Sequence, residues 1–340
     1  MDPSHALDAL PRLRLCQLPT PIQRLSRLEA ALGLASDAAP QLYIKRDDLT
    51  GLAFGGNKGR KLEFSLAEAR QQDADVVLTC GGVQSNHCRQ TAVAAAALGL
   101  EAHLFLRGGR PARLTGNLVP SELAGATFHF IGPGAGQTGP GSGVNLEDAM
   151  GRFAEELRSA GRRPYVIPTG ASNPTGAMGY VDAAREIAEQ QGELGVRFDW
   201  IVTASGSFGT QAGLLAGAAL FGLSARVMGV AVSPTRDVEA RRAEVARLAT
   251  RTAERLAPGT QIEVDRVVFE ADYAGPAYAT PTQAGTEAIR LLARLEGIFL
   301  DPTYTGKAMA GLIDYVRAGR FAPGERVLFV HTGGNLALFA

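Results

Sequence analysis

The sequence predicts an α/β protein whose sheets are mostly parallel, because short apolar runs alternate with longer segments of helical periodicity. The segment 146–159 illustrates the helical pattern, since Leu146, Met150 and Phe153 recur on one face. The chain has 340 residues, a length that favours two domains or one large domain. Parallel sheets bind ligands at the carboxyl ends of their strands, so the loops that follow strands are the places to search for a site.

Strands and helices are expected in alternation along the chain. The expected strands are 42–46, 76–80, 102–106, 127–131, 165–168, 200–204, 227–232, 267–269 and 327–331. The expected helices are 61–71, 86–98, 146–159, 176–190, 210–221, 238–256, 282–295 and 306–318. The stretch 132–143 is rich in glycine and proline and is expected to be a surface connection rather than a phosphate cradle.

Charge and composition argue against several classes of partner. Lysine plus arginine number 34, as do aspartate plus glutamate, so the net charge offers no attraction to nucleic acid or anionic membranes. The runs 91–100 and 211–223 are each shorter than the roughly 20 residues that cross a bilayer, and no signal peptide is expected. Three cysteines are too few for a disulfide framework and indicate a reducing cytoplasm. The spacing of His87, Cys80 and Cys88 fits no zinc pattern, so no metal is expected.

Lysine is scarce in this chain, and two lysines stand together. The chain contains Lys45, Lys58, Lys61 and Lys307, and all its other basic residues apart from histidine are arginine. A desolvated lysine amine can lose its proton and attack a carbonyl, whereas a guanidinium stays protonated. Lys58 follows two glycines, and Lys61 lies three residues on, so one amine can bind a ligand covalently while the other neutralises a phosphate. The alternative is a pair of surface charges at a helix start.

Two further segments each follow an expected strand and open a helix. Ser85 and Asn86 can cap the helix after 76–80, and a carboxylate bound there would meet backbone N–H groups; the alternative is capping alone. The small residues around 205–210 suit one phosphate at a helix start; the alternative is plain turn chemistry. Two later loops, 300–309 and 331–334, add hydroxyl groups.

Together these motifs resemble one family of enzymes. The segments 45–48, 55–63 and 84–91, with 274–278, 301–314 and 331–334, are similar to those of the pyridoxal-phosphate enzymes related to ACC (1-aminocyclopropane-1-carboxylate) deaminase and D-cysteine desulfhydrase. The resemblance implies a tryptophan-synthase-β-like fold (fold type II), with two parallel-sheet α/β domains and the cofactor between them. It implies a large domain of residues 1–60 and 171–340, an inserted domain of residues 61–170, and a homodimer.

The resemblance also implies roles for individual residues of the cofactor site. Lys58 matches the lysine that binds pyridoxal phosphate covalently, and Asn86 matches the residue that bonds the pyridine hydroxyl. The phosphate loop, with Lys61 nearby, matches Ser207, Phe208, Gly209 and Thr210. Thr332 matches the residue that faces the pyridine nitrogen.

The remaining matches concern the substrate, a small amino acid. Ser85 matches the serine beside the substrate carboxylate, with Asn86 and His87 next to it, and Tyr278 and Tyr304 match two active-site tyrosines. ACC has no hydrogen on its α-carbon, and its enzymes typically carry glutamine, glutamate and leucine at the positions that are here His87, Thr305 and Thr332.

Those three positions resemble the desulfhydrase branch instead. The expected reaction is removal of the α-proton by Lys58 and loss of the β-substituent, which converts D-cysteine to pyruvate, hydrogen sulfide and ammonia. L-cysteate, with sulfite as the leaving group, and ACC stay open as substrates. A nicotinamide-dependent oxidoreductase that uses the glycines near 206–213 is the alternative from a different class.

Overall fold

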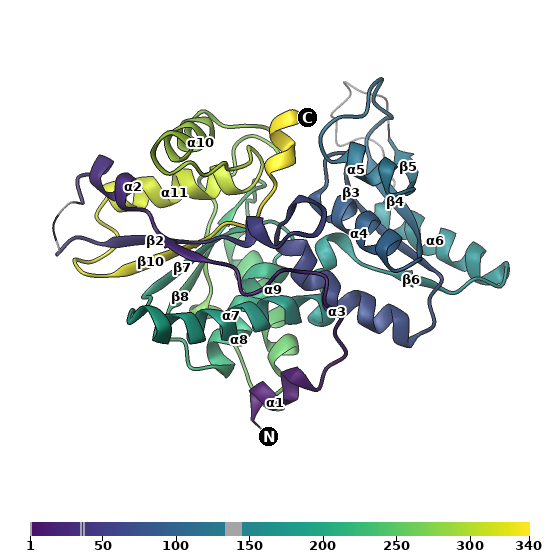
Figure 1. The fold of residues 1–340 in the computed structure, drawn as a ribbon, viewed down its shortest axis with the longest axis horizontal. Helices are drawn as coiled ribbons and strands as arrows, with labels where there is room; N and C mark the ends of the chain where they lie inside the picture. Colours follow the sequence, from purple (N-terminus) through teal and green to yellow (C-terminus); the bar gives the residue numbers. More distant parts are fainter. Residues whose placement is uncertain (1, 35, 37, 133–144) are drawn as a thin grey trace.

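The computed structural model describes residues 2–34, 36, 38–132 and 145–340 and contains two sheets (Figure 1). Most of the expected connection 132–143 lies outside the described residues. The larger sheet has the order β1 (Ile22–Arg24), β2 (Gln41–Lys45), β10 (Arg326–Val330), β7 (Trp200–Ser205), β8 (Arg226–Ala231) and β9 (Val268–Glu270). The smaller sheet has the order β5 (Thr127–Ile131), β4 (Glu101–Arg107), β3 (Val76–Gly82) and β6 (Pro164–Val166). All neighbouring strands are parallel except β1 and β2, which confirms the predicted fold class.

Both faces of the larger sheet are buried by helices, so its central strands are apolar on both sides. In β10, Val327 and Phe329 belong to one apolar core and Leu328 and Val330 to the other. The first core is covered by helices α2 (Ser26–Ala31), α10 (Gln283–Glu296) and α11 (Thr305–Arg317). The second is covered by α7 (Pro174–Leu194), α8 (Gly209–Leu220) and α9 (Val238–Ala253). Helices α7 and α8 lie below the strands in Figure 1.

The smaller sheet is covered in the same way. Helix α6 (Leu146–Ser159) packs on one face, where its predicted apolar side meets Val76 and Leu78. Helices α3 (Asn57–Gln71), α4 (Asn86–Ala97) and α5 (Leu118–Leu123) contribute to the cores on the other face. Helix α3 also packs against α7, so it joins the two sheets (Figure 1). The contact is close, because a Cβ added at Gly179 would lie 2.3 Å from the carbonyl oxygen of Arg60.

The sequence predictions miss short elements and one helix start. Strand β1 and helices α1 (Pro3–Asp8), α2 and α5 were not predicted, and each is only three or six residues long. Helix α3 begins at Asn57 rather than at 61, so the boundary expected between residues 60 and 61 falls inside this helix. All strands of the smaller sheet lie within residues 61–170. No helix in the described part of the chain is both long and apolar enough to cross a membrane.

Candidate active site

The first turn of α3 directs two amines to one carbonyl group. Lys58 and Lys61 are three residues apart and share a helix face. Their Nζ atoms donate to the carbonyl oxygen of Gly170, at 3.4 Å from Lys58 and 3.2 Å from Lys61. Gly170 has a φ of +67°, and a Cβ there would lie 3.1 Å from Lys58 Nζ and 2.4 Å from the Ser207 hydroxyl oxygen. Glycine is therefore required both by the backbone and by the space that the amines need.

Burial changes the chemistry of these two amines. Desolvation lowers the pKa of Lys58 to about 8, and a hydrogen bond with Lys61 opposes part of that shift. Burial, followed by the nearby charge of Lys58, holds the pKa of Lys61 well below its usual value. A neutral Lys58 amine is therefore accessible near neutral pH, as a nucleophile or a base requires.

The second part of the site is the turn between β7 and α8. Thr210, in the first turn of α8, accepts a hydrogen bond from the Asn57 side chain at 2.9 Å. A Cβ added at Gly209 would lie 2.7 Å from Lys61 Nζ and 2.8 Å from the Ser172 hydroxyl oxygen. An amine thus faces the positive end of a helix, which is unfavourable unless an anion lies between them.

A phosphate group fits this arrangement. Ser207 bonds the Ser172 hydroxyl at 2.7 Å, and in the described part of the chain no side chain caps the start of α8. The helix N–H groups, the hydroxyls and Lys61 together provide the donors that one phosphate uses. Phe208 contributes through its backbone, which adopts a φ of +65°. Its ring packs on Phe269 with centroids 6.0 Å apart, so it is not itself a phosphate ligand.

The end of β3 provides the third part of the site. Ser85 caps α4 by accepting a hydrogen bond from the Cys88 N–H at 3.2 Å, as the sequence predicts. Asn86 accepts from the Asn117 side chain at 3.0 Å. His87 is buried, and its Nε2 bonds the Thr79 hydroxyl at 2.8 Å. Burial, with the charges of the two site lysines, holds the pKa of His87 well below its usual value, so this ring is neutral.

Two tyrosines connect the strand ends of the two sheets. The hydroxyls of Tyr278 and Tyr304 are hydrogen-bonded, with ring centroids 6.0 Å apart. A Cβ added at Gly82, the end of β3, would lie 3.4 Å from the Tyr278 ring. A Cβ added at Gly206, just after β7, would lie 3.8 Å from the Tyr304 ring. Burial and then Tyr278 raise the pKa of Tyr304 well above its usual value, so Tyr304 keeps its proton at neutral pH.

The two threonines expected at the site differ in what they can offer. Thr332 follows β10, and its carbonyl oxygen accepts the Asn57 N–H at 3.0 Å, so its backbone supports the turn before Lys58. Thr305 is fully buried, and its hydroxyl donates to Asp301 Oδ1 at 2.8 Å. The only proton of that hydroxyl is therefore used to start helix α11.

A buried ionic network behind α3 is not evident from the sequence. Arg60 is fully buried and bonds Asp47 at 2.9 Å and Glu186 at 2.9 Å. Tyr180 donates to Asp47 at 2.6 Å, and Lys45 pairs with Glu186. Two cations and two anions balance each other, which fixes the first turn of α3 against α7. Lys45, Asp47 and Arg60 belong to motifs noted in the sequence, whereas Glu186, inside a long helix, gives no such signal.

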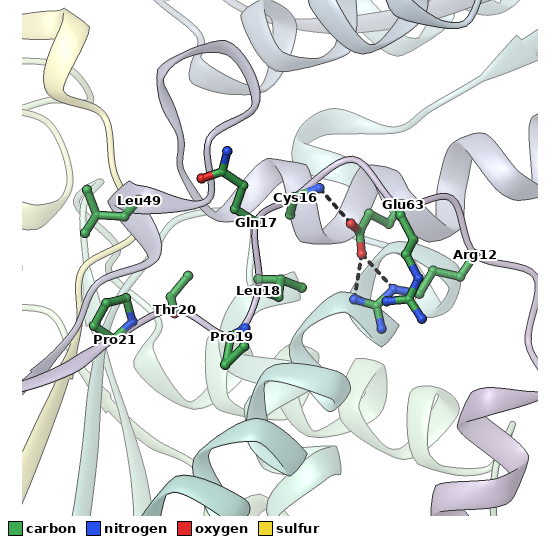
Figure 2. A pocket seen from close by; sticks show the side chains of 10 residues that line it. Arg12, Cys16, Gln17, Leu18, Pro19, Thr20, Pro21, Leu49 and Glu63 are labelled. Atoms are coloured by element: carbon green, nitrogen blue, oxygen red, sulfur yellow. Dashed lines mark hydrogen bonds and ion pairs between the residues drawn. The ribbon is translucent and has the colours of Figure 1, made fainter.

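A separate hollow lies along the N-terminal segment, on another side of α3 (Figure 2). Glu63 accepts hydrogen bonds from the N–H groups of Leu15 and Cys16 at 2.9 Å each and from Arg12 at 2.7 Å. A Cβ added at Gly59 would lie 2.6 Å from Cys16 Sγ. This contact attaches residues 12–17 to the helix that carries Lys58, and the hollow itself contains none of the expected site residues.

The fold, together with this arrangement of donors, is that of an enzyme that depends on pyridoxal phosphate. The chain belongs to the pyridoxal-phosphate dependent enzyme family, whose model matches residues 13–333. It is 44% identical over 341 residues to a 1-aminocyclopropane-1-carboxylate deaminase of Burkholderia vietnamiensis, covering 98% of this chain and 97% of that protein. It is 43% identical to the corresponding protein of Burkholderia ambifaria over the same shares of both chains.

Solved structures agree with this membership. A crystal structure of an ACC deaminase homologue superposes with a TM-score of 0.87 at 40% identity, covering 99% of this chain and 96% of that one. A threonine deaminase of T.th. superposes with a TM-score of 0.67 at 22% identity, over 98% and 97% of the two chains, and shares the fold. The expected family, fold type II and cofactor are confirmed. The nicotinamide-dependent alternative is therefore dropped.

Proposed function

We propose that this enzyme catalyses β-elimination on a small amino acid, with D-cysteine converted to pyruvate, hydrogen sulfide and ammonia. The observation that carries the proposal is the set of residues at His87, Thr305 and Thr332, where ACC enzymes typically carry glutamine, glutamate and leucine. Thr305 is buried and bonded to Asp301, so this position offers no carboxylate for acid–base work on a substrate lacking an α-hydrogen.

The proposed roles are those that the family resemblance implies, and the geometry of the chain supports them. Lys58 binds the cofactor covalently and, once released, takes the α-proton with an amine whose pKa is lowered to about 8. Lys61 and the start of α8 hold the phosphate. Bound pyridoxal phosphate supplies the electron sink for the charge left when that proton departs. The start of α4, at Ser85 and Asn86, orients the substrate carboxylate.

The tyrosine pair and Thr332 complete the proposed site. Tyr304 stays protonated at neutral pH and shares a hydrogen bond with Tyr278, so the pair can donate to the departing sulfur or to the substrate amino group. Thr332 offers a hydroxyl, not a carboxylate, to the pyridine nitrogen. His87, bonded to Thr79, shapes the wall behind the substrate.

Deamination of ACC is the second candidate, and the names of the relatives favour it over D-cysteine. Both Burkholderia proteins, at 44% and 43% identity, are described as ACC deaminases. The same fold and the same Lys58 would serve that reaction, but the first step could not be removal of an α-proton. L-cysteate, with sulfite as the leaving group, is the third substrate to compare.

Product analysis distinguishes these substrates. The purified yellow protein is incubated separately with D-cysteine, L-cysteine, L-cysteate and ACC, and sulfide, sulfite, pyruvate and 2-oxobutyrate are measured. The proposal expects sulfide and pyruvate from D-cysteine, and no product from the Lys58→Ala variant. 2-Oxobutyrate from ACC, or sulfite from L-cysteate, with D-cysteine inert, would overturn the substrate assignment and retain the family.

We further propose a homodimer in the cytoplasm, with residues 61–170 as the inserted domain. The family resemblance supports the dimer, and the confinement of the smaller sheet to that segment supports the domain division. Light scattering after size-exclusion chromatography measures the mass directly. The proposal expects twice the 35.7 kDa of one chain, and a mass of one chain would contradict it.

A further inference from the structure

Lys307 is a buried lysine with three backbone acceptors. It lies in the first turn of α11 and is fully buried. Its Nζ donates to the carbonyl oxygens of Ala274 at 2.6 Å, Val232 at 3.2 Å and Ala277 at 3.4 Å. An ammonium group has three N–H donors, so this set of acceptors suits its charged form. The arrangement differs from that of Lys58 and Lys61, whose amines share one carbonyl.

Two of these carbonyls belong to the loop that carries Tyr278. Ala274 and Ala277 precede Tyr278 by four and one residues, and the turn between them includes Gly275 with a φ of +73°. The third carbonyl, of Val232, follows β8 directly, and a Cβ at Gly206 would lie 3.1 Å from the Val232 side chain. Lys307 thus attaches the Tyr278 loop to the carboxyl ends of β7 and β8, next to the turn between β7 and α8 that is proposed to bind phosphate.

Tyr304 is fixed at the same end of the same helix. The Asp301 carboxylate is fully buried and accepts the N–H groups of Thr303 at 2.8 Å, Tyr304 at 2.9 Å and Thr305 at 2.8 Å. Tyr304 and Lys307 are three residues apart, about one helical turn. One turn of α11 therefore determines where both tyrosines stand.

We propose that Lys307 is a positioning residue that sets the contact between the hydroxyls of Tyr278 and Tyr304. The inference rests on the proposed function where it concerns turnover, because the tyrosines are there assigned to proton transfer. The position of the loop itself is a property of the protein without substrate. Two measurements therefore separate the two claims.

The first measurement is hydrogen exchange of the peptide 271–281 in the cofactor-loaded protein without substrate. The Lys307→Met variant, which keeps an unbranched side chain and loses the donors, should exchange several-fold faster there than the wild type. Gly275→Ala should give the same result with Lys307 intact, because its Cβ would lie 2.5 Å from the Thr282 methyl carbon. Unchanged exchange of this peptide in folded Lys307→Met would overturn the proposal, whatever the substrate.

The second measurement is a double-mutant cycle on kcat, with whichever substrate the protein turns over. Lys307→Met should lower kcat by about 10-fold to 100-fold, as expected for a displaced catalytic group, and change KM little. Adding Lys307→Met to Tyr278→Phe should cost almost nothing further, because the residue acts through that hydroxyl. If the double variant loses kcat by the product of the two single losses, Lys307 acts independently of the Tyr278 hydroxyl, and the proposal is overturned. If Lys307→Met does not fold, the cycle is run with Gly275→Ala in its place.

Faster hydrogen exchange of peptide 271–281 in Lys307→Met, with no turnover of D-cysteine by the wild type, would support the role of Lys307 and reject only the proposed substrate. Turnover of D-cysteine by the wild type, combined with losses in kcat that multiply in the double mutant, would support the substrate and reject the role of Lys307. The absorbance of the bound cofactor should stay the same in Lys307→Met, since none of its three bonds involves Lys58 or Lys61.

Discussion

Lys58 and Lys61 donate to the same carbonyl oxygen, that of Gly170, from 3.4 and 3.2 Å. Two amines so close together cannot both carry a charge in a buried site without a large free-energy cost, and after burial itself it is the charge of Lys58 that lowers the pKa of Lys61. In the proposed site, a phosphate would restore the charge of Lys61 while Lys58 would stay available to react.

Lys61→Met should weaken the binding of pyridoxal phosphate and leave that of pyridoxal, which lacks the phosphate, unchanged. Loss of one charged hydrogen bond of about 1.5–3 kcal/mol corresponds to roughly 10-fold to 100-fold in Kd. Titration of the protein freed of cofactor, followed by absorbance, measures both constants. An equal loss for the two ligands would show that Lys61 is not a phosphate ligand.

The reaction of cofactor-free protein with pyridoxal phosphate should accelerate as pH rises through about 8 and level off above it. The neutral amine is the nucleophile, and burial lowers the pKa of Lys58 to about 8 from the 10.5 of a free lysine. Stopped-flow absorbance at constant ionic strength gives the profile. A rate that still climbs steeply between pH 9 and about 10.5, as expected for a lysine in water, would contradict the predicted site.

Gly170→Ala should impair cofactor binding, and Gly195→Ala provides a matched control. Both glycines have a similar φ, +67° and +62°, so both variants carry backbone strain of about 1–2 kcal/mol. Only at Gly170 does the added carbon meet Ser207 and Lys58. At Gly195, apart from the adjoining backbone, no atom of the residues that the structure describes lies within 4 Å. The midpoint temperature of thermal unfolding should fall in both variants. The Kd for the cofactor should rise at least about 10-fold only in Gly170→Ala. Equal Kd values for the two variants would argue against a cofactor site beside Gly170.

Arg60→Met should destabilise the protein strongly, because it leaves Asp47 and Glu186 with an unbalanced buried charge. Removing one partner from such a network costs about 3–5 kcal/mol. The exposed pair of Arg158 and Glu155 serves as the control, since Arg158→Ala should cost less than about 1 kcal/mol. Urea unfolding of both variants measures the difference. Similar losses in the two would mean that the buried network contributes no more than a surface pair.

The sequence predicts the layered fold well because its signals are local. The alternation of Val327, Leu328, Phe329 and Val330 between two cores follows directly from their apolar run. Strand β1 and the six-residue helices could not be predicted, because three to six residues are too few to show a hydrophobic period. The start of α3 at Asn57 was missed because Gly59 weakens the local helical pattern, while packing against α7 supports the helix.

The residues of the candidate site could be named from the sequence, but the distances between them could not. Lys58, Lys61 and Ser85 stand out by residue type and by their place after a strand or before a helix. The contact between Tyr278 and Tyr304 could not be predicted, because it joins segments 26 residues apart through tertiary packing. The attachment of the Tyr278 loop by Lys307 and the partnership of Arg60 with Glu186 are of the same kind.

The central claim is that Lys58, and not its neighbour Lys61, carries the cofactor. Borohydride reduction of the yellow protein, followed by proteolysis and mass spectrometry, locates the phosphopyridoxyl group on one residue. We predict a single modified peptide with the added mass on Lys58. The same mass on Lys61, or on a lysine outside this helix, would contradict the site described above.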